Sequence, residues 1–286
     1  MAEIISGKIV SEKLRSELRE EIVEYKNKYG IAPGLAVVMV GDDPASAVYV
    51  RNKHKACLDV GIESYQIEFP EEITEEELLK KIDELNADDK VNGILVQLPL
   101  PSGINEEKVI ERISPDKDVD AFHPSNVGRI MIGNYSFLPC TPAGIISLLD
   151  HYNVEIAGKR CAVVGRSNIV GKPMALLLTE RNGTVTLCHS KTRDLENILR
   201  ESDIIVVAIG KAEFLHADMV KPGAVVIDVG INRNAEGKLV GDVAFGEVSQ
   251  VASMITPVPG GVGPMTITTL LRNTLSAAKL QILKRN

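Results

Sequence analysis

The feature that most constrains the fold of this chain is the repeated alternation of short apolar runs with helical patterns. In the first half, the apolar run LAVVMVG at residues 35–41 precedes an amphipathic segment at residues 74–86, and GILVQLPLP follows at residues 93–101. The second half repeats the alternation with the runs CAVVG (161–165), TVTLCHS (184–190), DIIVVAIG (203–210) and AVVIDVGIN (224–232). Strands and helices that alternate with short links are typical of parallel α/β sheets. We therefore predict an α/β fold with parallel sheets and, at this length, two domains.

An irregular segment separates the two halves. Residues 114–140, SPDKDVDAFHPSNVGRIMIGNYSFLPC, show neither helical nor strand periodicity, and Thr141-Pro142 then opens a new helical pattern. We expect this segment to connect the two domains.

Charge, hydropathy and cysteine spacing exclude several classes of protein. The net charge of −7 over 286 residues argues against a nucleic-acid binder, because phosphate backbones recruit basic surfaces. The apolar runs are far shorter than the ~20 residues that span a membrane. The first ten residues, MAEIISGKIV, lack the regions of a signal peptide. The four cysteines are far apart and form no metal-ligand spacing with the histidines. We expect a cytoplasmic protein that binds no membrane and no metal.

The strand–loop–helix stretch CAVVGRSNIVGKPMALLL suggests a dinucleotide site. Gly165 ends the strand and Gly171 opens the helix. Glycines at these points let backbone N–H groups approach a pyrophosphate at the helix N-terminus. The spacing differs from G-x-G-x-x-G, so an ordinary strand-to-helix turn is an equal alternative for this loop alone.

The end of the following strand favours NADP over NAD. An NAD site usually carries an acidic residue there, which binds the ribose 2′-hydroxyl. Residues 188–193, CHSKTR, contain no acid. Basic and polar side chains could instead surround a 2′-phosphate, namely Arg166, His189, Ser190 and Arg193.

A later strand end, DVGIN at residues 228–232, lies at the same predicted edge of the sheet. Ligands of open α/β sheets bind at the carboxyl ends of strands. Gly230 and Ile231 are therefore candidate neighbours of the nicotinamide, and the alternative is a plain turn.

A lysine in the first half lies on the apolar side of its predicted helix. Asp43-Pro44 is a helix-start signature, so YVRNKHKA at residues 49–56 is helical. At 100° per residue, Tyr49 lies about 40° from Lys53, whereas Arg51 and Lys55 lie about 160° away. Burial would push the pKa of Lys53 toward neutrality, which suits acid/base chemistry. Snorkelling of the ammonium to solvent is the alternative, and helical geometry leaves both readings open.

Eight motifs in order resemble those of one enzyme family, the bifunctional methylenetetrahydrofolate dehydrogenase/methenyltetrahydrofolate cyclohydrolases. They cover nearly the whole chain. The motifs are Tyr49-x-x-x-Lys53, VQLPLP (96–101), PDKDVDAFHP (115–124), PCTPAG (139–144), GRSNIVGKP (165–173), CHSKT (188–192), DVGIN (228–232) and TPVPGGVGPMT (256–266).

The resemblance implies two reactions on one folate and a two-domain architecture. NADP⁺ would take a hydride from 5,10-methylenetetrahydrofolate, and water would then open the methenyl product to 10-formyltetrahydrofolate. It implies a catalytic folate-binding domain of residues 1–138 plus 267–286, a Rossmann-like NADP domain of residues 139–266, and a cleft between them. A cytoplasmic homodimer that serves purine biosynthesis and one-carbon metabolism is the further expectation from the family.

The resemblance also assigns roles to individual residues. Lys53 matches the catalytic lysine, Gln97 the glutamine that tunes it, and Asp120 the aspartate that anchors the pterin ring. Tyr49 matches the tyrosine that stacks on the p-aminobenzoyl ring. Further folate neighbours are Leu98 and the loop residues Pro259, Gly260 and Gly261. The NADP contacts are Gly165, Arg166, Ser167, Ser190 and Ile231.

One position departs from the family pattern. Glycine usually follows the pterin aspartate, whereas Ala121 follows Asp120 here. Alanine is strained there only if the position needs a positive φ. We expect the substitution to be harmless, because one methyl group is a small intrusion.

Two other classes of function compete with this reading. A dehydrogenase of a small acid, similar to shikimate dehydrogenase, would also pair an NADP domain with a lysine-bearing α/β domain. It does not explain Gln97 in VQLPLP or the loop PGGVGP (259–264). A non-catalytic NADP-binding regulator would not need Lys53, Gln97 and Asp120 together.

Overall fold

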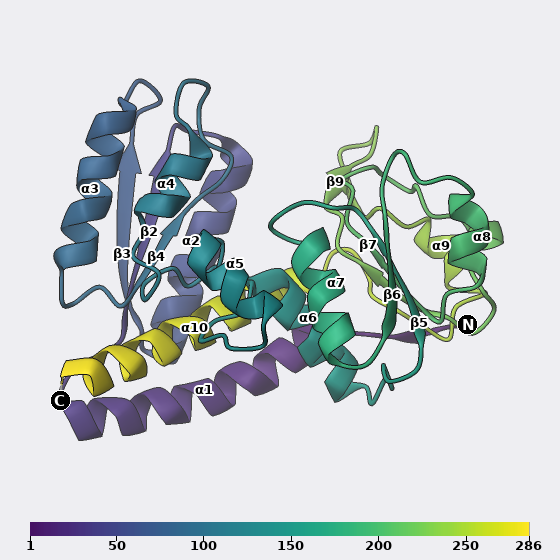
Figure 1. The fold of residues 1–286 in the computed structure, drawn as a ribbon, viewed down its shortest axis with the longest axis horizontal. Coiled ribbons are helices and arrows are strands. Elements are labelled where there is room, and N and C mark those ends of the chain that lie inside the picture. The colour runs from purple at the N-terminus through teal and green to yellow at the C-terminus, as the bar shows by residue number, and fades with distance from the viewer. Residues whose placement is uncertain (286) are drawn as a thin grey trace. The chain divides into compact units, whose positions relative to one another are not determined.

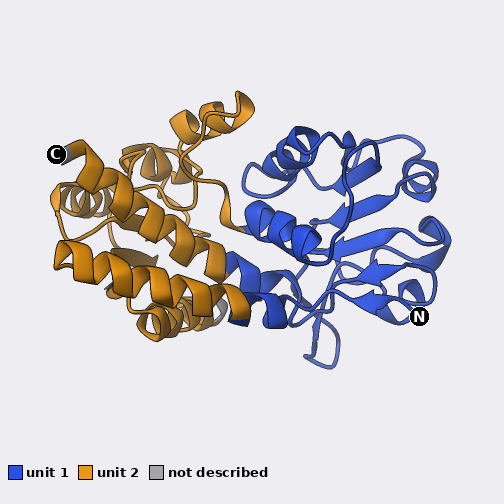
Figure 2. Cartoon of the chain, turned by 90° about the horizontal axis from the view of Figure 1, so that it is seen from below, with its two compact units in different colours: residues 1–12, 141–266 blue, residues 13–140, 267–286 orange. Residues whose placement is uncertain are grey.

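The computed structural model describes residues 1–285 and divides the chain into two compact units. Unit 1 contains residues 1–12 and 141–266, and unit 2 contains residues 13–140 and 267–286 (Figure 2). The chain passes from one unit to the other within two long helices and between residues 140 and 141. These helices are α1 (Gly7–Tyr29) and α10 (Val262–Arg285).

Unit 2 is built on a three-stranded parallel sheet in the order β3-β2-β4. The strands are β2 (Gly34–Val40), β3 (Glu63–Phe69) and β4 (Gly93–Val96). The crossover helices are α2 (Pro44–Val60), between β2 and β3, and α3 (Glu75–Ala87), between β3 and β4. Parallel strands need such crossovers, because a tight turn cannot return the chain to the start of the sheet.

Apolar side chains cover both faces of this sheet. Leu78 and Ile82 of α3, with Val109 of α4 (Glu106–Arg112), pack on the face that Val38 and Ile94 line. The helix α2 contacts β2 and β3 on the other face (Figure 1). The unit also contains the short helix α5 (Pro124–Met131). The sheet is thus the middle layer of three.

The parts of α1 and α10 that belong to unit 2 lie side by side (Figures 1 and 2). Arg15 Nε donates to Thr268 Oγ1 at 2.9 Å, and Lys279 pairs with Glu21 at 2.9 Å. Further along α10, Gln281 Nε2 donates to the carbonyl oxygen of residue 92 at 2.9 Å. This last bond fixes α10 to the loop just before β4.

Unit 1 is a six-stranded parallel sheet in the order β1-β11-β8-β7-β5-β6. The strands are β1 (Glu3–Ile4), β5 (Arg160–Val164), β6 (Thr184–Cys188), β7 (Ile204–Val207), β8 (Val225–Asp228) and β11 (Met254–Ile255). The helices are α6 (Cys140–His151), α7 (Gly171–Glu180), α8 (Leu195–Arg200), the 3₁₀ helix η1 (Ala217–Met219) and α9 (Phe245–Val248). A small hairpin joins β9 (Asn232–Arg233) to β10 (Leu239–Val240).

The predicted α/β class with parallel sheets is confirmed. The predicted domain bounds differ from the compact units at the N-terminus. Residues 1–12 belong to unit 1, because β1 pairs with β11 at the edge of the larger sheet. A two-residue strand is too short to leave a pattern in the sequence. Residues 114–140 are not a connection either, since they lie wholly within unit 2 and include α5.

The strand β3 was not predicted because it is polar. Its sequence is ESYQIEF, and it forms an edge of the three-stranded sheet, where only part of each side chain is covered. Edge strands tolerate such charged residues. Among the described helices, none combines the length and the apolar character that crossing a membrane requires.

The N-terminal cap of α3 can be tested by mutation. Thr74 Oγ1 accepts from the backbone N–H of Glu77 at 3.2 Å, and Glu77 Oε2 accepts from the backbone N–H of Thr74 at 3.0 Å. Replacing Thr74 with alanine should lower the free energy of unfolding by about 1 kcal/mol, because the N–H of Glu77 at the helix end loses its acceptor. Urea unfolding measures the change. The control Thr179→Ala, within α7, should stay within about 0.5 kcal/mol of the parent, and an equal loss there would contradict the capping assignment.

Candidate active site

The helix α2 presents Lys53 to the interior of unit 2. Asp43 caps the helix by accepting from Ser46 N–H at 2.7 Å, and Pro44 occupies the first helical position. Lys53 is only 9% exposed, whereas Arg51 and Lys55 are exposed. The structure therefore confirms the predicted division of this basic stretch into one inward lysine and two solvated neighbours.

A glutamine at the end of β4 holds this lysine. Lys53 Nζ donates to Gln97 Oε1 at 2.9 Å. Gln97 is fixed in turn, because its backbone N–H donates to Val38 O at 2.8 Å and its Nε2 donates to Leu98 O at 2.7 Å. The second bond occupies the amide nitrogen, so the amide oxygen is the atom that faces the lysine.

Burial lowers the pKa of the Lys53 amine from its ordinary value, because the charged form loses hydration. The carboxylate of Asp120 acts in the opposite direction and favours the ammonium form. Gln97 adds a neutral acceptor, which can bond either form of the amine. The three residues that were predicted to act together, Lys53, Gln97 and Asp120, thus lie in one neighbourhood.

Two further predicted folate neighbours lie on the same elements. Tyr49 precedes Lys53 by one turn of α2 and is 37% exposed, so part of its ring is accessible. Partial burial raises the pKa of the Tyr49 hydroxyl, so the phenol stays protonated at neutral pH. Leu98 follows Gln97 and is partly buried.

The loop that carries Asp120 is held by a buried carboxylate. Asp118 is 2% exposed and accepts from the backbone N–H of His123 at 2.9 Å and from Asn126 Nδ2 at 2.8 Å. Burial raises the pKa of Asp118, and these bonds oppose the rise. Because the acceptor lies before Asp120 and the donors lie after it, the bonds close the loop around Asp120.

A second clamp on this loop comes from α10. Asn273 Nδ2 donates to Val119 O at 2.8 Å and to Leu138 O at 2.9 Å. Sequence reasoning missed Asn273, Asp118 and Asn126 as supports of the site. The motif that contains Asp118 was noticed, but its hydrogen-bond partners become visible only in three dimensions.

The backbone at Ala121 corrects one expectation. Ala121 has a φ of 57° and is fully buried. This is the left-handed region, which costs a residue with a Cβ about 1–2 kcal/mol. The position therefore does require the conformation that glycine adopts most easily, and alanine is strained there.

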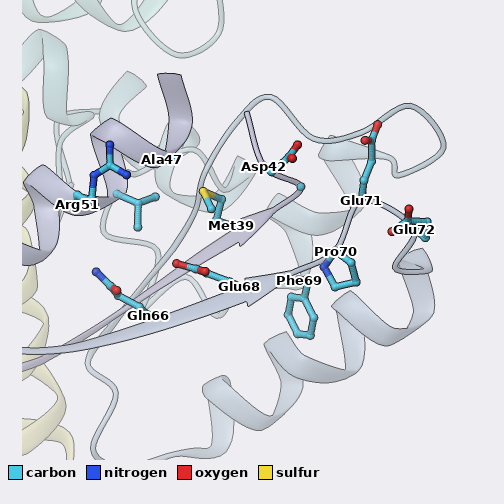
Figure 3. A pocket seen from close by; sticks show the side chains of 12 residues that line it. Met39, Asp42, Ala47, Arg51, Gln66, Glu68, Phe69, Pro70, Glu71 and Glu72 are labelled. Carbon is cyan, nitrogen blue, oxygen red and sulfur yellow. The ribbon is translucent and has the colours of Figure 1, made fainter. Parts of the chain in front are cut away.

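A cavity of about 760 Å³ opens elsewhere in unit 2, between α2 and the outer part of the sheet (Figure 3). Met39 and Glu68 face it from the strands, and Arg51 faces it from the helix. The lining combines apolar and charged side chains and contains none of Lys53, Gln97 and Asp120. The cavity is thus separate from the lysine site.

In unit 1, the loop between β5 and α7 is tightly folded around two glycines. Gly165 has a φ of 119°, and a Cβ on it would overlap the carbonyl oxygen of Ala208. A Cβ on Gly171 would overlap the carbonyl oxygen of Gly165. Backbone without side chains at the N-terminus of a helix fits a pyrophosphate, which needs close approach to N–H groups.

The polar residues of this loop are accessible. Ser167 Oγ accepts from the N–H groups of Val170 at 3.2 Å and Gly171 at 3.3 Å, so it caps the first turn of α7. Arg166 is exposed beside it. A guanidinium at this position can donate two parallel hydrogen bonds to a phosphate.

The end of β6 lies next to this loop. Gly165 N–H donates to Cys188 O at 2.9 Å, so His189 follows at the same edge of the sheet. His189 Nδ1 accepts from the N–H of Lys191 at 3.1 Å, while Ser190 and Arg193 are exposed. Cationic groups on two adjacent strand ends, with no acid on the second strand, fit a 2′-phosphate.

The remaining predicted residues also lie in unit 1. Ile231 is 48% exposed after β8, and Gly230 is buried beside it. The loop of Pro259, Gly260 and Gly261 lies against the start of α1, where Lys8 N–H donates to Gly260 O at 3.1 Å. Lys53, Gln97 and Asp120 belong to unit 2.

Removal of the Asp118 carboxylate tests the loop assignment. Asp118→Ala should lower the free energy of unfolding by about 1–3 kcal/mol, because buried donors of His123 and Asn126 lose their acceptor. Asp116→Ala is the matched control, since Asp116 is more open and pairs with Lys284 near the surface. It should cost about 1 kcal/mol or less. Thermal and urea unfolding of both variants measure the difference, and equal losses would refute the role of Asp118.

Two family models match the chain along most of its length. The catalytic domain model of tetrahydrofolate dehydrogenase/cyclohydrolase matches residues 5–120, and the NAD(P)-binding domain model of the same family matches residues 139–282. The "Bifunctional protein FolD" of Acetivibrio thermocellus is 60% identical over 280 residues, which are 98% of this chain and 98% of that protein.

Solved structures agree with the family models. The FolD methylenetetrahydrofolate dehydrogenase/cyclohydrolase of Campylobacter jejuni is 50% identical, with a TM-score of 0.96 over 98% of this chain and 100% of that chain. The Trypanosoma brucei enzyme, solved with NADP cofactor and inhibitor, is 40% identical, with a TM-score of 0.95 over 98% of each chain. The shikimate dehydrogenase of Aquifex aeolicus shares the fold alone, at 15% identity and a TM-score of 0.52. The chain therefore belongs to the tetrahydrofolate dehydrogenase/cyclohydrolase family.

Proposed function

We propose that this protein oxidises 5,10-methylenetetrahydrofolate to 5,10-methenyltetrahydrofolate with NADP⁺ and hydrolyses the product to 10-formyltetrahydrofolate. The observation that carries the proposal is the buried amine of Lys53, bonded to Gln97 at 2.9 Å and close to Asp120. A buried, pKa-lowered amine with a fixed neutral acceptor suits proton transfer near neutral pH.

The hydrolytic step assigns a role to each of these groups. Water adds to the electrophilic methenyl carbon and loses one proton. One carbon–nitrogen bond of the five-membered ring then breaks as the formyl carbonyl forms, and the remaining hydroxyl proton goes to the released nitrogen. The neutral amine of Lys53 orients the water and accepts its proton. Gln97 holds the amine in place, and Asp120 anchors the pterin ring by accepting from its N–H groups.

The oxidation needs orientation more than acid/base catalysis. NADP⁺, when bound, accepts the hydride that leaves the one-carbon bridge. The loop of Gly165 and Gly171 holds the pyrophosphate, and Arg166, Ser190 and Arg193 bind the 2′-phosphate. Ile231 provides an apolar contact after β8. Holding two reactants in register supplies most of the acceleration in such a transfer.

The finer biological setting is also part of the proposal. The product is a one-carbon donor of the kind that purine biosynthesis consumes, and the family expectation is a homodimer in the cytoplasm. A small-acid dehydrogenase is not favoured, because it explains a lysine but not the Gln97 that is bonded to it. A non-catalytic regulator is not favoured either, because the buried lysine would destabilise its folded state without serving catalysis.

Two assays with the purified protein test the proposal. The protein should reduce NADP⁺ when given 5,10-methylenetetrahydrofolate, and it should hydrolyse the methenyl compound when that is supplied directly. Lys53→Met should lower hydrolysis by about 10²–10⁴-fold, because the proton acceptor is lost. The oxidation should fall less, since it needs no base.

The stability of the same variant separates catalysis from folding. A buried charged amine destabilises the folded state, so Lys53→Met should leave the unfolding temperature unchanged or higher. Lys55→Met, on the exposed face of the same helix, should retain both activities. Normal hydrolysis by Lys53→Met would show that Lys53 is not the proton acceptor. Absence of turnover by the parent protein would refute the proposed function.

The pH profile gives a second test. Burial lowers the pKa of Lys53 below its ordinary value of 10.5, so the hydrolysis rate should rise with pH and level off below 10.5. Gln97→Glu places a negative charge beside the amine and raises its pKa. The profile of Gln97→Glu should therefore shift to higher pH, with a lower rate at pH 7. An unshifted profile would mean that the titrating group is not Lys53.

The lowered pKa of Lys53 also predicts how the stability of the folded protein changes with pH. Because the folded-state pKa lies below the unfolded value, the folded protein binds the proton less tightly, and the contribution of Lys53 to stability decreases as pH falls through this range. Gln97→Glu should weaken that dependence.

Cofactor preference tests the assignment of Arg166. Arg166→Ala should weaken binding of NADP⁺ by about 10–100-fold and of NAD⁺ far less, because only NADP⁺ carries the 2′-phosphate. Titration calorimetry with both cofactors measures the ratio. The control Arg160→Ala, at the opposite end of β5, should leave both affinities unchanged. Equal weakening for both cofactors would show that Arg166 does not bind the 2′-phosphate.

A further inference from the structure

Two buried aspartates of unit 1 have no place in the reaction described above. Asp228 ends β8 and is 3% exposed, and Asp242 follows β10 and is fully buried. Burial raises the pKa of Asp228 to about 6. Buried carboxylates are normally paired with a cation, and the bonds recorded for these two come from amide N–H groups instead.

The bonds to Asp242 join two strand ends. Its Oδ2 accepts from the N–H groups of Ile209 at 2.7 Å and Gly210 at 3.0 Å, directly after β7. Its Oδ1 accepts from Asn232 Nδ2 at 2.9 Å, at the start of β9. A single side chain thus fixes the segment after β7 to the segment after β8.

The bonds to Asp228 join the same region to the segment that carries Asp242. Asp228 Oδ1 accepts from Gly230 N–H at 3.0 Å and from the N–H of Asp242 itself at 2.9 Å. Its Oδ2 accepts from Val243 N–H at 3.0 Å. The two aspartates therefore form one network, which we call the carboxylate clasp.

Two glycines show how closely the clasp is packed. A Cβ on Gly230 would overlap Oδ1 of Asp242, and a Cβ on Gly241 would overlap Oδ2 of Asp228. Neither glycine has a positive φ, so both are required by space rather than by backbone conformation. The backbone therefore lies too close to each carboxylate for any residue with a Cβ.

The segments that the clasp fixes lie at the ligand-binding edge of the sheet. Ile209 and Ile231 are 37% and 48% exposed, and each adjoins a residue that bonds to the clasp. A Cβ on Gly165 would lie 3.4 Å from Ile209 Cγ2, so Ile209 is next to the glycine loop of β5. Parallel sheets bind their ligands at this carboxyl edge.

We propose that Asp228 and Asp242 are positioning residues for the cofactor, whose clasp holds the strand ends of Ile209 and Ile231 as a rigid apolar surface for the nicotinamide ring. Asparagine could not replace either residue, because its NH₂ group cannot accept the N–H bonds that both oxygens receive. This inference rests on the proposed use of NADP⁺, and it assigns neither aspartate a chemical step.

Asp242→Asn tests the clasp. Binding of NADP⁺, measured by calorimetry, should weaken about tenfold or more, since charged acceptors of buried bonds are lost. Hydrogen exchange of the Ile209 and Gly210 amides in the cofactor-free protein should quicken by a similar factor. Hydrolysis of the methenyl compound, which consumes no NADP⁺, should stay within about twofold.

A matched control and a milder variant guard against misfolding. Asp218→Asn changes an exposed carboxylate of the same unit and should alter none of the three measurements. If Asp242→Asn does not fold, Asn232→Ala removes only one donor to the clasp and should weaken NADP⁺ binding by a smaller factor.

The readouts separate the two proposals. Unchanged NADP⁺ affinity and amide exchange in Asp242→Asn would overturn the clasp while leaving the proposed function intact. Loss of methenyl hydrolysis together with NADP⁺ binding would also overturn the clasp, because it would show a general structural defect. A parent protein that binds NADP⁺ but does not oxidise the folate would refute the proposed function. The exchange and affinity changes would then still decide the clasp.

Discussion

The hydrogen bond between Lys53 and Gln97 is the interaction on which the proposed chemistry of unit 2 depends. An ammonium ion that leaves water loses hydration, and even a charged partner often repays only part of that loss. Gln97 is neutral, so it fixes the position of the amine without locking its charge. A carboxylate at this position would form an ion pair and raise the pKa of the lysine. The amide keeps the amine able to gain and lose a proton.

The remainder of unit 2 holds these two side chains at bonding distance. Gln97 extends β4, which pairs with β2 in the centre of the sheet, and Lys53 lies on the helix that leaves β2. The two residues are therefore connected through one short, fully buried strand. Apolar packing on both faces supplies the stability that the buried amine removes. In unit 1, the buried aspartates of the clasp are likewise stabilised by their surroundings, because backbone amides donate hydrogen bonds to them.

The features of the site that depend on a single helix or strand could be predicted from the sequence. The inward direction of Lys53 follows from helical geometry, and the place of Gln97 follows from the end of an apolar run. Asp118 and Asp242 were not predicted, because their partners are backbone N–H groups and asparagine side chains, and these contacts have no sequence signature. The strand β1 escaped prediction because two residues carry no period, and its pairing with β11 decides where residues 1–12 belong.

At Ala121, backbone strain is opposed by two stabilising contributions. The alanine was expected to be harmless because of its small size, yet its φ of 57° places it where a Cβ costs about 1–2 kcal/mol. Its methyl group is fully buried, and this burial stabilises the folded state by about 0.8 kcal/mol. Glycine would also lose about 0.4–1 kcal/mol through the greater freedom of its unfolded chain. These opposing contributions leave the two residues within about 1 kcal/mol of each other. The strain next to Asp120 is therefore compensated locally, and the clamps from Asp118 and Asn273 need only fix the direction in which the loop points.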